Sequence, residues 1–112
     1  MPQIDPRTEA AARLFFGRIA GQYDVAGAIL FGSRARGTHR PDSDADVAVL
    51  LNGAHQPRAA VALAMADLAY DVLVETGIDI SPLPVWVDEW ERPETFSNPP
   101  LLRNIAAEGV RL

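Results

Sequence analysis

The sequence predicts a small α/β (α+β) domain in which helices pack on a mixed sheet of three or four strands. The first indication is that short apolar runs, typical of buried strands, alternate with longer stretches in which apolar residues recur at helical spacing. The second is the length of 112 residues, which fits one compact domain. No long linker or internal repeat divides the sequence, so we expect residues 1–112 to form a single domain.

The first half of the chain predicts a helix, a strand and a polar connection. Asp5-Pro6 has the form of a helix N-cap followed by a proline in the first turn, and apolar residues recur behind it until Gly21. The apolar run 25–31 predicts a buried strand. Residues 32–43 are polar and contain two glycines and a proline, so we expect a loop or a single helical turn there.

The second half predicts two strands and two helices. Residues 44–51 alternate in the manner of a strand, and a longer helix is expected from 57 to about 76. Residues 78–87 indicate a further strand, which two internal prolines restrict to an edge of the sheet or to a bent course. A short helix over 101–108 completes the predicted order.

Composition excludes several classes of function. All ten basic residues are arginines, which excludes a P-loop lysine and a Schiff-base lysine, and the absence of cysteine excludes disulfides and thiolate zinc sites. Fifteen acids give a formal net charge of −5, which argues against direct binding of nucleic acid. No signal peptide and no apolar run of membrane-spanning length is visible, so we expect a cytoplasmic protein without membrane contact.

An anion-binding turn is predicted at the end of the first strand. Gly32-Ser33 follows the apolar run directly, and a glycine lets a phosphate approach the backbone N–H groups closely. Three arginines follow within seven positions and supply positive charge suited to phosphate oxygens: Arg34, Arg36 and Arg40. The turn therefore predicts a phosphate site.

Paired carboxylates follow the turn and predict a metal site. Asp44 and Asp46 lie two apart on a predicted strand, so both side chains leave the same face and repel each other unless a cation lies between them. Mg²⁺ binds one or two carboxylates together with substrate phosphates. Asp79 lies between two isoleucines in the next strand, and it would join the pair if the two strands are neighbours.

These residues carry a resemblance to a known family. Gly32-Ser33, ten further residues and then Asp44-Ala45-Asp46 match the GSx10DxD signature of the DNA polymerase β-like nucleotidyltransferase superfamily. The longer string GSRARGTHRPDSDADVAVL resembles the minimal nucleotidyltransferase (MNT) branch, and the resemblance extends over nearly the whole chain. It implies a polymerase β-like nucleotidyltransferase fold.

The resemblance also implies a role for each site residue. It places the nucleoside triphosphate, ATP, at three residues: Gly32, Ser33 and Arg36. It places two Mg²⁺ ions at three catalytic aspartates: Asp44, Asp46 and Asp79. Many MNT proteins are antitoxins encoded beside a HEPN-domain ribonuclease toxin, and members of this branch transfer AMP from ATP to a tyrosine of that toxin. The resemblance therefore implies AMP transfer to a cognate HEPN toxin and a hetero-oligomer with it.

Other interpretations of the same residues stay open. A catalytically weak MNT module could silence its partner by binding alone, and a small-molecule nucleotidyltransferase of the aminoglycoside-modifying type shares the motif. Taken singly, the glycine turn and the aspartates are ordinary surface features. We expect Arg34 and Arg40 to be solvated or to face a partner, and Asp67 and Asp71 to lie on a solvated helix face.

Overall fold

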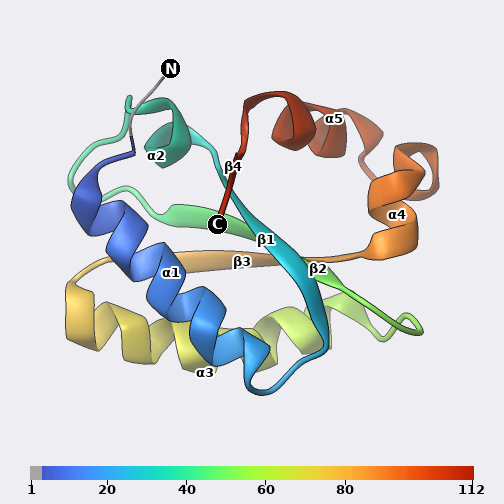
Figure 1. The fold of residues 1–112 in the computed structure, drawn as a ribbon, viewed down its shortest axis with the longest axis horizontal. Helices are drawn as coiled ribbons and strands as arrows, with labels where there is room; N and C mark the ends of the chain where they lie inside the picture. The colour runs from blue at the N-terminus through green and yellow to red at the C-terminus, as the bar shows by residue number, and fades with distance from the viewer. Residues whose placement is uncertain (1–3) are drawn as a thin grey trace.

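The computed structural model describes residues 4–112, which form five α-helices, a short 3-10 helix and four strands (Figure 1). In chain order these are α1 (Pro6–Ala20), β1 (Val25–Phe31), α2 (Ser33–Arg36), β2 (Ala45–Leu51), α3 (Arg58–Thr76), β3 (Ile80–Trp86), α4 (Val87–Glu91), η1 (Pro93–Thr95), α5 (Pro99–Glu108) and β4 (Val110–Arg111).

The four strands form one mixed sheet with the order β3-β2-β1-β4. β1 pairs antiparallel with β2 and with β4, whereas β2 and β3 pair in parallel because α3 crosses over between them. Helices pack on this sheet, so the predicted α+β class is confirmed. β3 lies at an edge of the sheet. Its two prolines have no backbone N–H to donate, and an edge strand tolerates this because only one of its sides pairs with a neighbouring strand.

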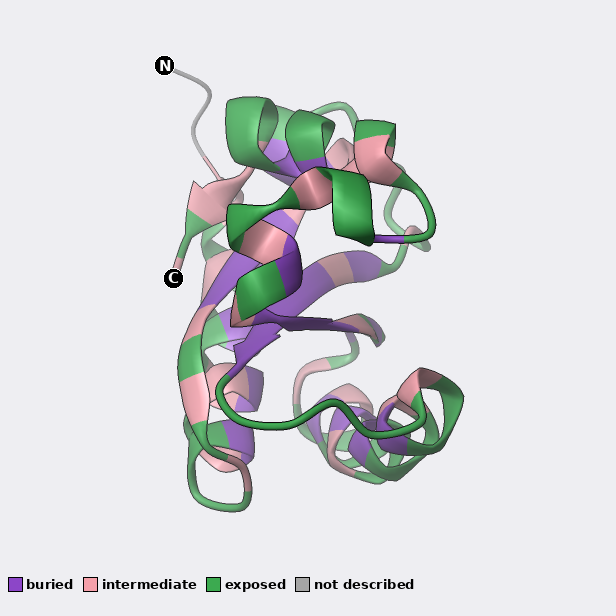
Figure 2. Cartoon of the chain, turned by 90° about the vertical axis from the view of Figure 1, so that its right-hand side faces the viewer, coloured by how far each residue is buried: buried purple, intermediate pink, exposed green. Residues whose placement is uncertain are grey.

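Helices cover both faces of the sheet and create two apolar clusters. α1 and α3 pack on one face, and α5 with η1 packs on the other. Alternate residues of β2 therefore point to opposite layers: Val47 and Val49 join the α1–α3 cluster, whereas Ala48 and Leu50 join the α5 cluster. Figure 2 shows the buried sheet between the two helical layers.

The ends of the two long helices follow the signals in the sequence. Asp5 caps α1, because its Oδ2 accepts hydrogen bonds from the backbone N–H and the hydroxyl of Thr8. α3 ends at Gly77, whose φ of 77° is the left-handed conformation that glycine adopts readily. No helix within residues 4–112 is both long enough and apolar enough to cross a bilayer.

Two small elements differ from the prediction. The strand expected over 78–87 is shorter, because the chain turns after Trp86 into α4. α4 is fixed by Glu89, which is buried and bonded to Arg58 from the distant start of α3. The two-residue strand β4 is too short to produce a periodic pattern in the sequence.

Candidate active site

The predicted phosphate turn is a single helical turn at the end of β1. Gly32 caps α2 with a φ of 79°, and Gly37 ends it with a φ of 74°, so both ends of the turn use the left-handed region that favours glycine. The N–H groups of Ala35 and Arg36 donate to the carbonyl oxygen of Gly32, so the donors that the turn offers to a ligand are those at its start, at Gly32 and Ser33. The turn thus presents backbone donors directly after the sheet.

The hairpin pairing of β1 and β2 brings this turn against a carboxylate. Phe31 faces Asp46 across the antiparallel ladder, which places Asp46 beside the residue that follows Phe31. A Cβ built at Gly32 would lie only 2.5 Å from Asp46 Oδ2, so only a glycine leaves this space free. The structure therefore brings the predicted phosphate turn and one predicted metal ligand into direct contact.

Asp79 reaches the same region through the parallel pairing of β2 and β3. Ala45 pairs with Ile80, and the backbone N–H of Ala45 donates to the carbonyl oxygen of Asp79 at 2.8 Å. Asp44 and Asp79 therefore stand side by side just before their two strands. Ile80 is buried and Asp79 is exposed, as the alternation in the sequence predicts.

The charge of Asp44 influences the ionisation of the two other carboxylates. Burial raises the pKa of Asp46, the negative charge of Asp44 raises it further, and the guanidinium of Arg36 lowers it. Burial and then the charge of Asp44 likewise raise the pKa of Asp79. Asp44 is thus the neighbour that both other carboxylates share. This mutual repulsion is the electrostatic condition that a divalent cation relieves.

The residues present fit Mg²⁺ by their chemistry, although they are not gathered into a finished ligand set. All three side chains offer carboxylate oxygens, the donors that Mg²⁺ prefers, and the space in front of Gly32 is kept clear for phosphate. Within residues 4–112 no group of three acidic, histidine or cysteine side chains is close enough to hold a metal ion unaided. The roles of Asp44, Asp46 and Asp79 as metal ligands therefore stay a prediction.

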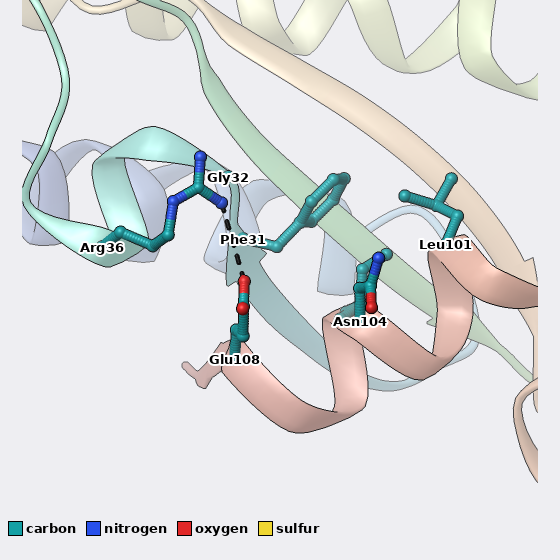
Figure 3. Close-up of a pocket in the computed structure, with 7 residues that line it drawn as sticks. Phe31, Gly32, Arg36, Leu101, Asn104 and Glu108 are labelled. Carbon is teal, nitrogen blue, oxygen red and sulfur yellow. Dashed lines mark ion pairs between the residues drawn. The ribbon is translucent and has the colours of Figure 1, made fainter.

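A pocket of about 250 Å³ opens beside the turn. Its walls come from the end of β1, from α2 and from α5, as Figure 3 shows: Phe31, Gly32, Arg36, Leu101, Asn104, Ile105 and Glu108. Arg36 Nη1 lies 3.7 Å from Glu108 Oε2 across the mouth of this pocket. The predicted phosphate arginine thus lies beside the pocket and beside Asp46, one of the three carboxylates that we call the acidic cluster (Asp44, Asp46 and Asp79).

Comparison with known proteins agrees with this arrangement. The family model described as a nucleotidyltransferase domain matches residues 13–105. The chain belongs to this family. A crystal structure of a protein from Sulfolobus solfataricus, assigned as a nucleotidyltransferase, matches with a TM-score of 0.50 and 15% sequence identity, covering 99% of this chain and 89% of that one. No curated protein matches the sequence.

Membership of the nucleotidyltransferase domain family confirms the superfamily that the GSx10DxD motif indicated, and with it a transfer of nucleotidyl groups. The structural match confirms the fold, because so low an identity carries information about architecture alone. The MNT branch and the pairing with a toxin stay predictions.

Arg34 corrects one expectation about the nucleotidyltransferase domain. The sequence predicts an Arg34 that is solvated or faces a partner, but Arg34 is only 3% exposed. Its guanidinium donates to the hydroxyl of Thr8 at 2.7 Å and to the carbonyl oxygens of Ser43 at 2.7 Å and Pro41 at 3.1 Å. Arg34 therefore fixes the loop that leads into the acidic cluster against the start of α1. Arg40 is exposed, as expected.

Sequence reasoning missed the contribution of α5 to this site. The helix itself was predicted, but nothing in its sequence indicates that Glu108 lies opposite Arg36 or that Asn104 lines the pocket. A charged residue in the last turn of a short helix is an ordinary surface feature. Only the packing of α5 on the same sheet face as Asp46 gives it a place in the site.

Proposed function

We propose that this nucleotidyltransferase domain transfers AMP from ATP to a tyrosine hydroxyl of a cognate HEPN-domain ribonuclease toxin and thereby acts as its antitoxin. One observation carries the proposal: the glycine turn after β1 lies against Asp46, while Asp44 stands beside Asp79 at the adjoining strand ends. A phosphate cradle next to clustered carboxylates suits attack of a hydroxyl on a phosphorus atom.

Each part of the site has a chemical task in this transfer. Backbone donors of the Gly32-Ser33 turn and the guanidinium of Arg36 hold the phosphates of ATP. Asp44, Asp46 and Asp79 would hold two Mg²⁺ ions, which when bound neutralise the phosphate charge and favour ionisation of the incoming hydroxyl. The space beside Gly32 lets the nucleotide approach the carboxylates closely.

The transfer forms one bond and breaks one. The tyrosine oxygen attacks the α-phosphorus of ATP in line with the bond to the β-phosphate, that bond breaks, and pyrophosphate leaves with its electron pair. Asp79 accepts the proton of the hydroxyl. Burial and the nearby charge of Asp44 raise the pKa of Asp79, which makes its carboxylate a stronger base.

The acceptor is assigned to a partner protein because, in the MNT branch that the chain resembles, a tyrosine of the cognate toxin receives the AMP. The resemblance to the MNT branch supports the choice of partner. A small-molecule nucleotidyltransferase of the aminoglycoside-modifying type, which shares the motif, is the alternative.

The proposal is tested by incubating the domain with α-labelled ATP, Mg²⁺ and the protein encoded by the neighbouring reading frame. We expect label on a tyrosine of that protein and loss of its ribonuclease activity, and we expect Asp44→Asn to lose at least about a hundredfold in rate. Asp42→Asn is the matched control, because Asp42 is exposed in the same loop and lies outside the acidic cluster.

Two results would contradict enzymatic antitoxin action. If Asp44→Asn silences the ribonuclease as well as the wild-type domain does, and no label is transferred, the domain acts by binding alone. If the domain instead protects a susceptible host against an aminoglycoside, the acceptor is a small molecule.

A further inference from the structure

The outer face of α3 exposes large apolar side chains. Leu63 is 74% exposed, Tyr70 63% and Val74 67%, and these are the large apolar residues that residues 4–112 leave exposed. Their spacings of seven and four residues place all three on one face of the helix, because successive residues are rotated by about 100°. The opposite face of α3 is the one that packs on the sheet.

An unpaired acidic flank runs beside this apolar stripe. Asp67 and Asp71 are exposed one turn apart, and neither forms an ion pair with any of the residues 4–112. The next acid along the helix, Glu75, is different, because Arg18 donates to both of its carboxylate oxygens at 2.8 and 2.7 Å. Two like charges four residues apart destabilise a helix unless something compensates them.

No cation on α3 itself supplies that compensation. The helix has one basic residue, Arg58, whose guanidinium is turned inward onto Glu89 and Pro84. The outer face therefore combines uncovered apolar area with uncompensated negative charge. A surface of this kind is complementary to an apolar ridge flanked by lysine or arginine side chains.

We propose that this surface, the outer α3 face (Leu63, Asp67, Tyr70, Asp71 and Val74), docks a partner protein through an apolar helix or ridge that carries basic residues along one side. The inference rests on the proposed function, because it identifies the docked partner with the protein that supplies the acceptor hydroxyl.

The position of α3 fits that role. The helix ends beside the start of β3, as Figure 1 shows, and Asp79 immediately precedes that strand. Val74 lies five residues before Asp79, so their Cα atoms are at most about 18 Å apart. The three carboxylates leave the sheet face opposite α3, so a partner bound along the outer α3 face would reach them by extending around the start of β3.

A second copy of the chain fits the same face less well. In an antiparallel pair of α3 helices the acidic flank of one copy meets the acidic flank of the other, and in a parallel pair it meets the alanines of the opposite flank. Neither arrangement places a cation beside Asp67 or Asp71. The charge pattern therefore favours a basic partner over self-association.

The test measures binding of the full chain to the purified product of the neighbouring reading frame by titration calorimetry. The apolar variant Leu63→Ser/Tyr70→Ser and the charge variant Asp67→Arg/Asp71→Arg are each compared with the wild type. We expect each to raise the Kd by roughly tenfold or more, and the wild-type Kd to rise with salt. Glu94→Arg, an exposed charge reversal on η1, is the matched control and should bind normally.

Circular dichroism and ATP binding of every variant verify that the fold and the nucleotide site are intact. Unchanged affinity of both α3 variants overturns the inference, as does a wild-type chain that does not bind the neighbouring protein. A dimer of the chain alone that Leu63→Ser/Tyr70→Ser dissociates also overturns it, in favour of self-association.

The same variants separate this inference from the proposed function. If the α3 variants bind and label the neighbouring protein as efficiently as the wild type does, while Asp44→Asn transfers no label, the docking surface is wrong and the transfer stands. If the α3 variants lose binding although the wild type transfers no label, the surface stands and the transfer is wrong.

Discussion

Gly32 is the residue at which the backbone and the acidic cluster meet. Its φ of 79° is costly for any other residue, and an added methyl group would collide with Asp46 Oδ2. We expect Gly32→Ala to lower the free energy of unfolding by about 1–2 kcal/mol and to abolish binding of Mg²⁺ and ATP, because Asp46 must move. Urea unfolding and titration calorimetry measure the two effects.

Gly53 provides a matched control for this substitution. It also has a left-handed backbone, with a φ of 90°, but a Cβ there would meet no atom within 4 Å. Gly53→Ala should therefore show a similar loss of stability from backbone strain while it binds nucleotide normally. Equal nucleotide binding by both variants would show that the contact with Asp46 is unimportant.

Asp46 carries a cost in stability that its proposed role explains. Because burial and Asp44 raise its pKa above the ordinary 3.8, the folded chain binds this proton more tightly than the unfolded chain does. The free energy of unfolding therefore falls as the pH rises from about 3.8 through the raised pKa. Above that pKa, the destabilisation that ionised Asp46 causes is complete and no longer changes with pH. At pH 7 the wild-type protein bears the full cost.

We accordingly expect Asp46→Asn to be more stable than the wild type at pH 7 in the presence of EDTA. The gain should stay below about 1 kcal/mol, since solvent screens a half-buried carboxylate. It should shrink as the pH falls toward 4, and the variant should not bind Mg²⁺. Urea unfolding at several pH values measures this, with Asp42→Asn expected to match the wild type throughout.

At the scale of elements, the loop between α2 and β2 depends on Arg34. Its buried guanidinium is shared by the carbonyl oxygens of Pro41 and Ser43 and by Thr8 of α1. Arg34→Met leaves these oxygens without their donor, and we expect a loss of about 3 kcal/mol in the free energy of unfolding. Faster proteolytic cleavage within the loop should accompany it. Arg40→Met, an exposed substitution in the same loop, should change neither measurement.

The start of α3 is joined to α4 by an ion pair between the half-buried Arg58 and the buried Glu89. Arg58 donates to Glu89 at 3.0 and 2.6 Å, and its guanidinium lies 5.2 Å from the Trp86 ring centre and 4.7 Å from that of Phe96. Glu89→Ala removes one partner of the pair, so we expect a loss of about 3 kcal/mol in thermal or urea unfolding.

The exposed pair nearby supplies the comparison for Glu89. His55 is hydrogen-bonded to Asp88 at 2.7 Å at the surface, so His55→Ala should destabilise the fold less than Glu89→Ala does. The double variant Arg58→Met/Glu89→Leu should be more stable than Glu89→Ala, because it leaves no charge buried alone. Equal losses for all three variants would argue against a special role for the buried pair.

These two arginines also mark the limit of prediction from the sequence. The long helices and the strands β1 and β2 follow from caps and periodicity, and Asp79 joins Asp44 because apolar neighbours fix its orientation. Arg34 stands in a polar loop, and only its bonds to Thr8 across the fold make it buried. α4 likewise depends on Arg58, a residue far away in the chain, so no local pattern indicates it.

At the scale of the whole molecule, part of the excess negative charge belongs to the carboxylates that would bind metal ions. Two Mg²⁺ ions would offset most of the formal net charge of −5. We expect the Mg²⁺ complex of a non-hydrolysable ATP analogue, at a hundred times its Kd, to raise the melting temperature by roughly 10 °C. Asp44→Asn should lose this rise in a thermal-shift measurement, whereas Asp42→Asn should retain it.

The topology of the sheet sets the order in which the site can assemble. β1 and β2 are close in sequence and pair antiparallel, so the glycine turn and Asp46 meet after a short loop closes. Asp79 joins only after α3 has formed and crossed back to lay β3 in parallel on β2. A folding intermediate with only the local hairpin would hold the phosphate turn and two aspartates without the third. Completion of the crossover, a non-local step of folding, is therefore also the step that brings the third predicted catalytic aspartate to the other two.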